Sequence, residues 1–362
     1  MRPLSDLQTI IDVTLPAFQL KTYIAALIKR SMDRYSRQVL LSQIGGKGQE
    51  ALNKSKVTII GCGALGTGIA EHLTRAGIGD ILLVDRDFIE LINLQRQHLF
   101  TESDVGEPKA VTAEEKLKDI NSEITITGVI EDVNQFNVEQ FIKGRDIILD
   151  GTDNLNVRYL INDACNKLRI PWIYGACVAV NGMTMNILPE GPCLRCLLPQ
   201  MPPPGSVPSC DTVGIINTLP SLISSIESTE ALKYLTGEPL DSCLTVVDIW
   251  DKDFRCIVVS QREGCPCCVN HDYEFLYNPQ ESVTVLCGRD AVQVTPLHKG
   301  EISLKSLAQK LALLGKVKET PHILFFSTDN FTMSIFCDGR AIIKGTNDEK
   351  KAKSLYAQYV GF

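Results

Sequence analysis

A glycine-rich turn after a short apolar run is the first feature of the sequence that could do chemistry. Residues 56–60 (Lys-Val-Thr-Ile-Ile) lead into residues 61–66 (Gly-Cys-Gly-Ala-Leu-Gly), and a helical pattern follows. Gly61 permits a tight turn, Gly63 lets the backbone approach a phosphate, and Gly66 lets the helix pack closely on the strand. A strand, such a turn and a helix N-terminus together predict a nucleotide-binding site.

One acidic and two basic residues follow this turn and could contact the nucleotide. Asp85 ends a second strand, 80–84, where a carboxylate usually binds ribose hydroxyls. Arg96 follows in a polar segment, and its planar guanidinium suits a phosphate. Lys109 comes after Pro108 in the first turn of an expected helix, so it either binds an anion or is simply solvated. The glycine pattern with a later acid also fits an NAD-dependent dehydrogenase.

Upstream of the turn, Arg34 and Arg37 are three residues apart and share one face if this stretch is helical. A solvated helix face explains this pair equally well.

A polar cluster follows the fourth expected strand, 145–149. Asp153 lies at the carboxyl edge of the parallel sheet, where ligands of open α/β sheets bind, and it could hold Mg²⁺. Asn154 could serve only as the N-cap of the helix that carries Arg158.

The cysteines form two pairs with metal-ligand spacing. Cys193 and Cys196 form one Cys-x-x-Cys motif, and Cys265 and Cys268 form another about 70 residues later. Two such pairs supply the four thiolates of a structural Zn²⁺ site. The alternative of two redox dithiols is weaker, because neither pair is expected to open a helix after a strand. Cys267 is too close to Cys265 for the usual chelate loop.

A further thiol, Cys210, follows a proline-rich stretch. Residues 201–208 (Met-Pro-Pro-Pro-Gly-Ser-Val-Pro) cannot form a helix or a central strand, so a flexible surface loop is expected there. A cysteine on such a loop is accessible, which is one requirement for a reactive thiol.

These residues need an α/β framework to position them. Alternating strands and helices predict a Rossmann-like nucleotide-binding sheet with helices on both faces. From about residue 273, short strands and two helices predict a small α+β domain, 271–362, after the main domain, 32–270. Residues 1–31 are an extension that either forms an amphipathic helix or precedes the true start at Met32. The main-domain strands are expected at 56–60, 80–84, 124–129, 145–149, 172–176 and 244–250, with helices at 67–76 and 218–235; the small domain has strands at 283–286, 293–294, 323–326, 332–336 and 341–344, with helices at 304–314 and 348–359.

Composition narrows the class of protein. A chain of 362 residues with a net charge of -7 offers no basic stripe for nucleic acid. No apolar run approaches the roughly 20 residues of a membrane-spanning helix. No secretory signal is visible, and the 13 cysteines then favour thiol or metal chemistry over disulfides, so the cytoplasm is expected.

Taken together, six ordered motifs resemble the ThiF/MoeB (HesA) family of sulfur-carrier adenylyltransferases, relatives of the ubiquitin-activating enzymes. The resemblance covers roughly residues 32–269. The motifs are Arg34-Tyr-Ser-Arg37-Gln38, Gly61-Cys-Gly-Ala-Leu-Gly66, Asn93-Leu-Gln-Arg96-Gln97, Pro108-Lys109, Thr152-Asp153-Asn154 and the two Cys-x-x-Cys pairs.

The resemblance implies an activity: ATP-dependent adenylation of the C-terminal glycine carboxylate of a small ubiquitin-like carrier protein ending in Gly-Gly, with release of pyrophosphate. Hydride transfer would need neither the basic residues nor a metal, which puts the dehydrogenase second to it. The implied roles are ribose binding by Asp85, phosphate binding by Asn93, Arg96 and Lys109 with Gln97 and Asn154 nearby, Mg²⁺ binding by Asp153, donation of Arg37 to the neighbouring subunit of a homodimer, and sulfur transfer or a covalent carrier link at Cys210.

The pathway is less defined. Asp338-Gly-Arg-Ala341 with Lys344-Gly345 is similar to the C-terminal extension of some thiazole-pathway members, which favours a thiamine carrier over a molybdopterin carrier. A zinc-stabilised scaffold that binds a nucleotide without turning it over is the alternative from another class.

Overall fold

The computed structural model describes residues 34–202, 206, 208–277, 283–286, 291–294 and 302–361. The predicted extension 1–31 lies outside these residues, as do positions 203–205 and 207 of the predicted proline-rich loop.

The larger sheet has eight strands in the order β3-β2-β1-β4-β5-β6-β7-β8. Its first five strands are parallel and the last three are antiparallel. The five parallel strands were all predicted, whereas β6 and β8 were not. The strands are β1 Lys56–Ile60, β2 Asp80–Val84, β3 Thr125–Val129, β4 Ile147–Asp150, β5 Trp172–Val178, β6 Asn181–Ile187, β7 Cys243–Asp248 and β8 Asp253–Val258.

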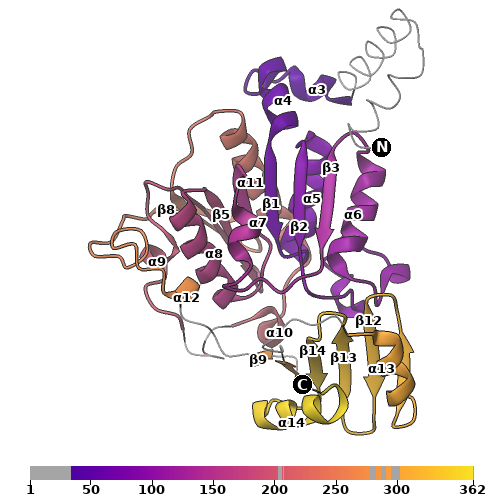
Figure 1. Ribbon diagram of the computed structural model, residues 1–362. Coiled ribbons are helices and arrows are strands. Elements are labelled where there is room, and N and C mark those ends of the chain that lie inside the picture. Colours follow the sequence, from indigo (N-terminus) through magenta and orange to yellow (C-terminus); the bar gives the residue numbers. More distant parts are fainter. Residues whose placement is uncertain are drawn as a thin grey trace, which may run out of the picture.

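Helices cover both faces of this sheet (Figure 1), because neighbouring strand residues point to opposite sides. Ile59 packs in a core with α4, α5, α6 and α11, and Ile60 packs in a second core with α7, α8, α9 and α12. The α/β Rossmann-like prediction is therefore confirmed. The helices are α3 Ser36–Val39, α4 Gly45–Lys54, α5 Ala64–Ala76, α6 Lys109–Ile120, α7 Val138–Ile142, α8 Leu155–Leu168, α9 Leu194–Leu197, α10 Cys210–Val213, α11 Thr218–Leu235 and α12 Glu274–Tyr277.

A second, six-stranded antiparallel sheet follows, in the order β11-β12-β13-β14-β10-β9. Helices α13 and α14 pack against it over a separate core that includes Phe326, Met333 and Tyr356. Strand β11 was not predicted, and α13 ends at Leu311 instead of Leu314. The elements are β9 Val283–Leu286, β10 Ala291–Val294, α13 Leu304–Leu311, β11 Lys316–Glu319, β12 Ile323–Ser327, β13 Thr332–Phe336, β14 Ala341–Lys344 and α14 Glu349–Tyr359.

Figure 1 places the second sheet near the end of the larger sheet at which β1 runs into α5. The segment directly after β2, residues 86–90, contacts the second sheet, and Asp132 adds a hydrogen bond to Gln293. Among the helices in the described ranges, none is long and apolar enough to cross a membrane.

Candidate functional site

Three glycine backbones meet at the floor of the site. Gly61 has φ +94°, and a Cβ on Gly66 would lie 1.8 Å from the Gly61 carbonyl oxygen. A Cβ on Gly151, after β4, would lie 2.4 Å from the same oxygen. Any side chain at these positions would force the turn away from β4, so the steric reasons predicted for Gly61 and Gly66 are confirmed. Helix α5 begins at Ala64 with Gly63 as its N-cap, three residues earlier than predicted.

Asp85 is fixed beside this turn at the end of β2. Its carboxylate accepts hydrogen bonds from the backbone N–H of Cys62, at 2.6 Å, and of Asp87, at 2.7 Å. Burial raises the pKa of Asp85, and the nearby Lys109 ammonium partly offsets that rise. The carboxylate thus connects the glycine turn to the segment after β2.

Lys109 begins α6 and is buried, with only 4% of the residue exposed. Its Nζ lies 3.7 Å from Oδ2 of Asp87, so the solvated alternative for this lysine is wrong. A buried ammonium at a helix N-terminus is unfavourable unless anions surround it. The carboxylates of Asp85 and Asp87 supply part of that compensation.

Asn93 and Gln97 are buried in the polar segment that follows. Asn93 ends the short helix η1, Leu91–Asn93, and its Oδ1 accepts a hydrogen bond from the Glu90 backbone N–H at 3.1 Å. Gln97 is 3% exposed, and its Nε2 lies 4.0 Å from the position that a Gly63 Cβ would occupy. Its Oε1 has no hydrogen-bond partner among the described residues. An unsatisfied carboxamide oxygen beside the glycine turn is suited to a ligand group that donates a hydrogen bond, such as a hydroxyl.

Arg96 is half-buried, and its Nη1 donates to the Ile92 carbonyl at 3.1 Å. The guanidinium therefore contacts its own turn in this conformation.

The end of β4 contributes a second group of polar residues. Asn154 caps α8 by accepting from the backbone N–H of Asn156 at 2.9 Å, so its predicted capping role is confirmed. Asp153 is exposed at the same edge of the sheet.

Arg158 and Glu227 are buried residues that the sequence did not indicate as functional. Arg158 pairs with Asp150 at 2.8 Å and donates to the Gly175 carbonyl at 2.7 Å, which ties β4 to β5. Glu227, on α11, is fully buried beside Gly175, and its carboxylate has no hydrogen-bond partner in the described chain. Burial, and then the charge of Asp150, raises the pKa of Glu227 well above its ordinary value. For Arg158, the sequence indicated only that it lies on the helix that Asn154 caps. Nothing in the sequence indicated the burial of Glu227.

Arg37 is not brought together with the other predicted residues. It is exposed on α3, which is anchored at the C-terminal ends of α5 and α6. Gln38 donates to the Ala76 carbonyl at 3.0 Å, and Arg34 donates to the Ile120 carbonyl at 3.0 Å. Because α5 has 13 residues and is about 20 Å long, Arg37 lies at the opposite edge of the sheet from the glycine turn.

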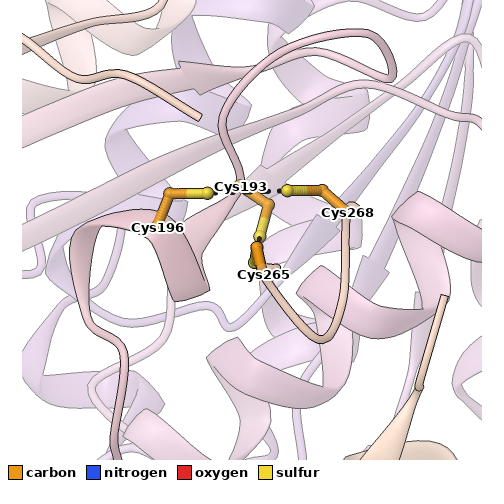
Figure 2. A group of neighbouring side chains, drawn as sticks. All are labelled: Cys193, Cys196, Cys265 and Cys268. Carbon is orange, nitrogen blue, oxygen red and sulfur yellow. Dashed lines mark hydrogen bonds between the residues drawn. The ribbon is translucent and has the colours of Figure 1, made fainter. Parts of the chain in front are cut away.

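The four cysteines of the two predicted pairs converge (Figure 2), and their sulfur atoms all lie within 4.8 Å of one another. Sγ of Cys193 is 3.7 Å from Sγ of Cys265, and Sγ of Cys196 is 3.5 Å from Sγ of Cys268. A tetrahedral ion with metal–sulfur bonds of about 2.3 Å separates its ligands by roughly 3.8 Å, so the four thiols fit such an ion.

Two details of the cysteine cluster differ from or refine the prediction. Cys193 is the N-cap of α9, so this motif does open a short helix. Cys267 is buried beside the cluster, within reach of the Cys193 thiol, and accepts a hydrogen bond from Asn162 at 3.1 Å. The Asn162 Oδ1 accepts from the Leu194 backbone N–H at 2.8 Å. Asn162 thus supports both halves of the cluster from α8.

The other cysteines depart from expectation in two places. Cys210 begins α10 instead of lying on a flexible loop, and it is half-buried with its Sγ 3.3 Å from the Cys177 carbonyl. The thiol is therefore only partly exposed in this conformation. Cys243 and Cys256 form a disulfide between β7 and β8, although the composition favoured free thiols.

Known proteins resemble this chain in sequence and in fold. The chain is 42% identical over 335 residues to the sulfur carrier protein ThiS adenylyltransferase of Bacillus subtilis, a match that covers 91% of this chain and 99% of that protein. It is 38% identical to the SAMP-activating enzyme E1 of Haloferax volcanii and 38% identical to a sulfur carrier protein adenylyltransferase of Thermus thermophilus. These two matches each cover 66% of this chain, and 88% and 92% of the relatives.

A crystal structure of E. coli MccB with MccA-N7isoASN has the same fold, with a TM-score of 0.58 and 22% identity. The likeness covers 70% of this chain and 83% of that one. The sequence pattern of the ThiF family matches residues 35–267, which contain the glycine turn, the buried lysine and three of the four clustered cysteines. This chain therefore belongs to the ThiF family.

Proposed function

We propose that this protein uses ATP to adenylate the C-terminal glycine carboxylate of a small ubiquitin-like sulfur-carrier protein. The observation that carries the proposal is the convergence of the glycine turn, the Asp85 carboxylate and the buried Lys109 ammonium at one edge of the sheet. The relatives named as adenylyltransferases support the reaction type.

In the proposed reaction a carrier carboxylate oxygen forms a bond to the α-phosphorus of ATP. The bond from that phosphorus to the bridging oxygen of the β-phosphate breaks, and pyrophosphate leaves with the electron pair. Such a step depends on positioning and on neutralising negative charge more than on a general base. Asp85 would hold the ribose, Gly63 would admit the phosphates, and Asn93, Gln97 and Lys109 would donate to them. Asn154, fixed as the α8 cap, would border the same ATP site.

Arg96 would have to rotate from the Ile92 carbonyl to reach a phosphate. Its present hydrogen bond is to an exposed backbone oxygen, which water can replace. We include Arg96 in the phosphate site on that basis.

Two metal ions complete the proposal. Asp153 would hold Mg²⁺, a hard cation that prefers carboxylate and water ligands and would supply positive charge to the phosphates. Cys193, Cys196, Cys265 and Cys268 would hold a structural Zn²⁺, because four thiolates at these distances suit a closed tetrahedral site.

Arg37 would act in the site of a neighbouring subunit, since it is exposed at the edge of the sheet that its own site does not use. A homodimer follows from this assignment. Cys210 would take part in sulfur transfer or in a covalent link to the carrier after release from α10. We assign the adenylyltransferase unit to residues 32–270 and a small α+β domain to residues 271–362.

The test is carrier-dependent exchange of pyrophosphate into ATP, run separately with a thiamine-type and a molybdopterin-type carrier ending in Gly-Gly. We expect exchange with the thiamine-type carrier, on the basis of the 42% identity to the Bacillus subtilis protein. Exchange with the molybdopterin-type carrier alone would move the proposal to the molybdenum cofactor pathway. ATP binding without exchange would favour a nucleotide-binding scaffold, and tight NAD binding with no ATP binding would favour an oxidoreductase.

A further inference from the structure

The segment after β2 lies between the proposed nucleotide site and the second sheet. On one side Asp85 and Asp87 face the glycine turn and Lys109. On the other side the Phe88 ring packs edge-on against Phe325, with centroids 5.3 Å apart, and lies 6.4 Å from the Phe336 ring. This segment therefore has an apolar anchor in the second sheet and polar contacts in the proposed site.

Arg340, in the turn between β13 and β14, donates a hydrogen bond to the backbone of this segment. It is 1% exposed, and its Nη2 donates to the Arg86 carbonyl at 3.0 Å. Its guanidinium lies 4.0 Å from the centre of the Phe336 ring, and its Nε is 3.4 Å from the Asp338 carboxylate. A buried guanidinium is costly unless it is hydrogen-bonded, because it has lost its contact with water. A hydrogen bond from this charged group to a backbone carbonyl is stronger than one between neutral groups.

Gln293, on β10, reaches the side chain of Arg86 through a shared carboxylate. Gln293 Nε2 donates to one oxygen of Asp132 at 2.9 Å, and Arg86 Nη1 donates to the other oxygen at 2.8 Å. The Arg86 guanidinium also lies 3.7 Å from Asp87. Both the backbone and the side chain of Arg86 are thus held from the second sheet.

Lys344, on β14, reaches the buried end of the segment. Its Nζ pairs with Oε1 of Glu90, whose backbone N–H donates to Oδ1 of Asn93. The contact of Arg340 therefore ends one residue from Asp85 and Asp87, and that of Lys344 ends one hydrogen bond from Asn93. The contact of Gln293 reaches Arg86 through Asp132.

We propose that the second sheet sets the position of the nucleotide site, with Arg340 as the principal positioning residue and Gln293 and Lys344 as secondary ones. The inference rests on the proposed function, because the residues it positions are those assigned to ATP. Arg340 touches no reacting atom; it fixes the backbone one residue after Asp85. Loss of the contact lets the Asp85–Asn93 segment shift, and small displacements of binding groups weaken ligand binding strongly.

The test compares Arg340→Ala with Ser303→Ala. Ser303 caps α13 by accepting from the Ser306 backbone N–H, so its loss weakens the same part of the chain without touching residues 86–93. We expect Arg340→Ala to raise the KM for ATP by at least about tenfold, the scale of one charge-assisted hydrogen bond, with a much smaller change in kcat. Hydrogen–deuterium exchange of residues 86–93 should rise with it. Ser303→Ala should lower Tm and leave both the KM and this exchange unchanged.

Equal effects of the two variants on the KM at equal loss of Tm would overturn the inference, because the second sheet would then act only through stability. If Arg340→Ala does not fold, Lys344→Ala replaces it, since Lys344 is partly exposed and its removal leaves the core intact. An unchanged KM for ATP and unchanged exchange of residues 86–93 in Lys344→Ala would also contradict the proposal. Wild-type protein that binds no ATP would defeat the proposed function itself, whereas normal wild-type binding with an insensitive Arg340→Ala defeats this inference alone.

Discussion

The buried charge of Lys109 is the feature of a single residue on which the proposed chemistry depends most. The ammonium begins a helix, where the helix dipole opposes it, and it lies 3.7 Å from the Asp87 carboxylate. A cation in such a position gains most when a more highly charged anion arrives. The phosphates of ATP are such an anion.

We therefore expect Lys109→Ala to lower carrier-dependent pyrophosphate exchange by at least about a hundredfold, because the developing negative charge loses a preorganised cation. Lys118→Ala is the matched control, since Lys118 lies on the same helix and pairs with the exposed side of Glu114. Exchange assays and Tm measurements on both variants check this. Full activity in Lys109→Ala would remove the residue from the site.

Asp163 gives a prediction for stability against pH. Burial raises its pKa to about 6 from the ordinary 3.8, while the Phe275 backbone N–H donates to its carboxylate at 2.9 Å and partly opposes the rise. The folded protein thus holds a proton that the unfolded chain has released, and this contribution to stability is present below pH 4 and lost as the pH rises through about 6.

Asp163→Asn should remove that dependence while keeping an oxygen for the Phe275 N–H. The free energy of unfolding of Asp163→Asn, measured in urea at several pH values between 4 and 7, should increase relative to that of the wild type as the pH rises. A constant difference between the two proteins across this range would contradict the assignment.

At the scale of helices and strands, the cysteine cluster joins α9 to the segment before α12. Metal bound there would stabilise the folded state, because the unfolded chain has no preformed site.

We expect about one Zn²⁺ per chain, the content of a four-thiolate site. Cys265→Ser should lose the ion and lower Tm by at least about 5 °C. Cys267→Ser is the control, since Cys267 is buried next to the cluster but is not one of the four cysteines whose sulfur atoms converge. Metal analysis beside thermal unfolding separates the two, and a stable wild-type protein without metal would refute the zinc site.

The sequence predicted those strands whose own burial gives them a recognisable pattern of apolar residues. Strands β1, β2, β4 and β5 are apolar runs because both faces of that part of the sheet are covered, whereas β3 alternates. The turn at Gly61 was found because only glycine fits there. Strand β8 was missed because five of its six residues are exposed, which leaves no alternation to detect. Strand β6 begins with Asn181 and Gly182, which are unfavourable in strands.

The candidate site was predictable where a residue contacts its neighbours in the sequence, and it was not predictable where segments far apart in the sequence meet. Asn154 caps the helix directly after it, so spacing was enough. The contact of Arg340 with Arg86 joins residues 254 positions apart, and no local pattern indicates it. The contact of Cys210, on α10, with the carbonyl of Cys177, on β5, likewise joins segments 33 residues apart.

At the scale of the whole molecule, the role proposed for Arg37 in a neighbouring subunit means that one chain would not complete its own site. We expect Arg37→Ala and Lys109→Ala to be inactive separately and to recover about a quarter of wild-type exchange when mixed and allowed to exchange subunits. Random pairing gives half mixed dimers, each with one intact site. No recovery, with subunit exchange verified by mass, would place Arg37 outside the neighbouring site. Mixing each variant with itself is the control.

The cysteine cluster also closes a ring of chain. Cys193 and Cys265 are 72 residues apart, and the ring between them contains Cys210, α11, β7 and β8. An ion that stayed on the thiolates in denaturant would keep this ring shut and would restrict the unfolded chain by about 4 kcal/mol, on the loop-closure scale for a ring of this length. Strands β7 and β8 would then return to the larger sheet from a cyclic segment, which has far fewer conformations to search than an open one.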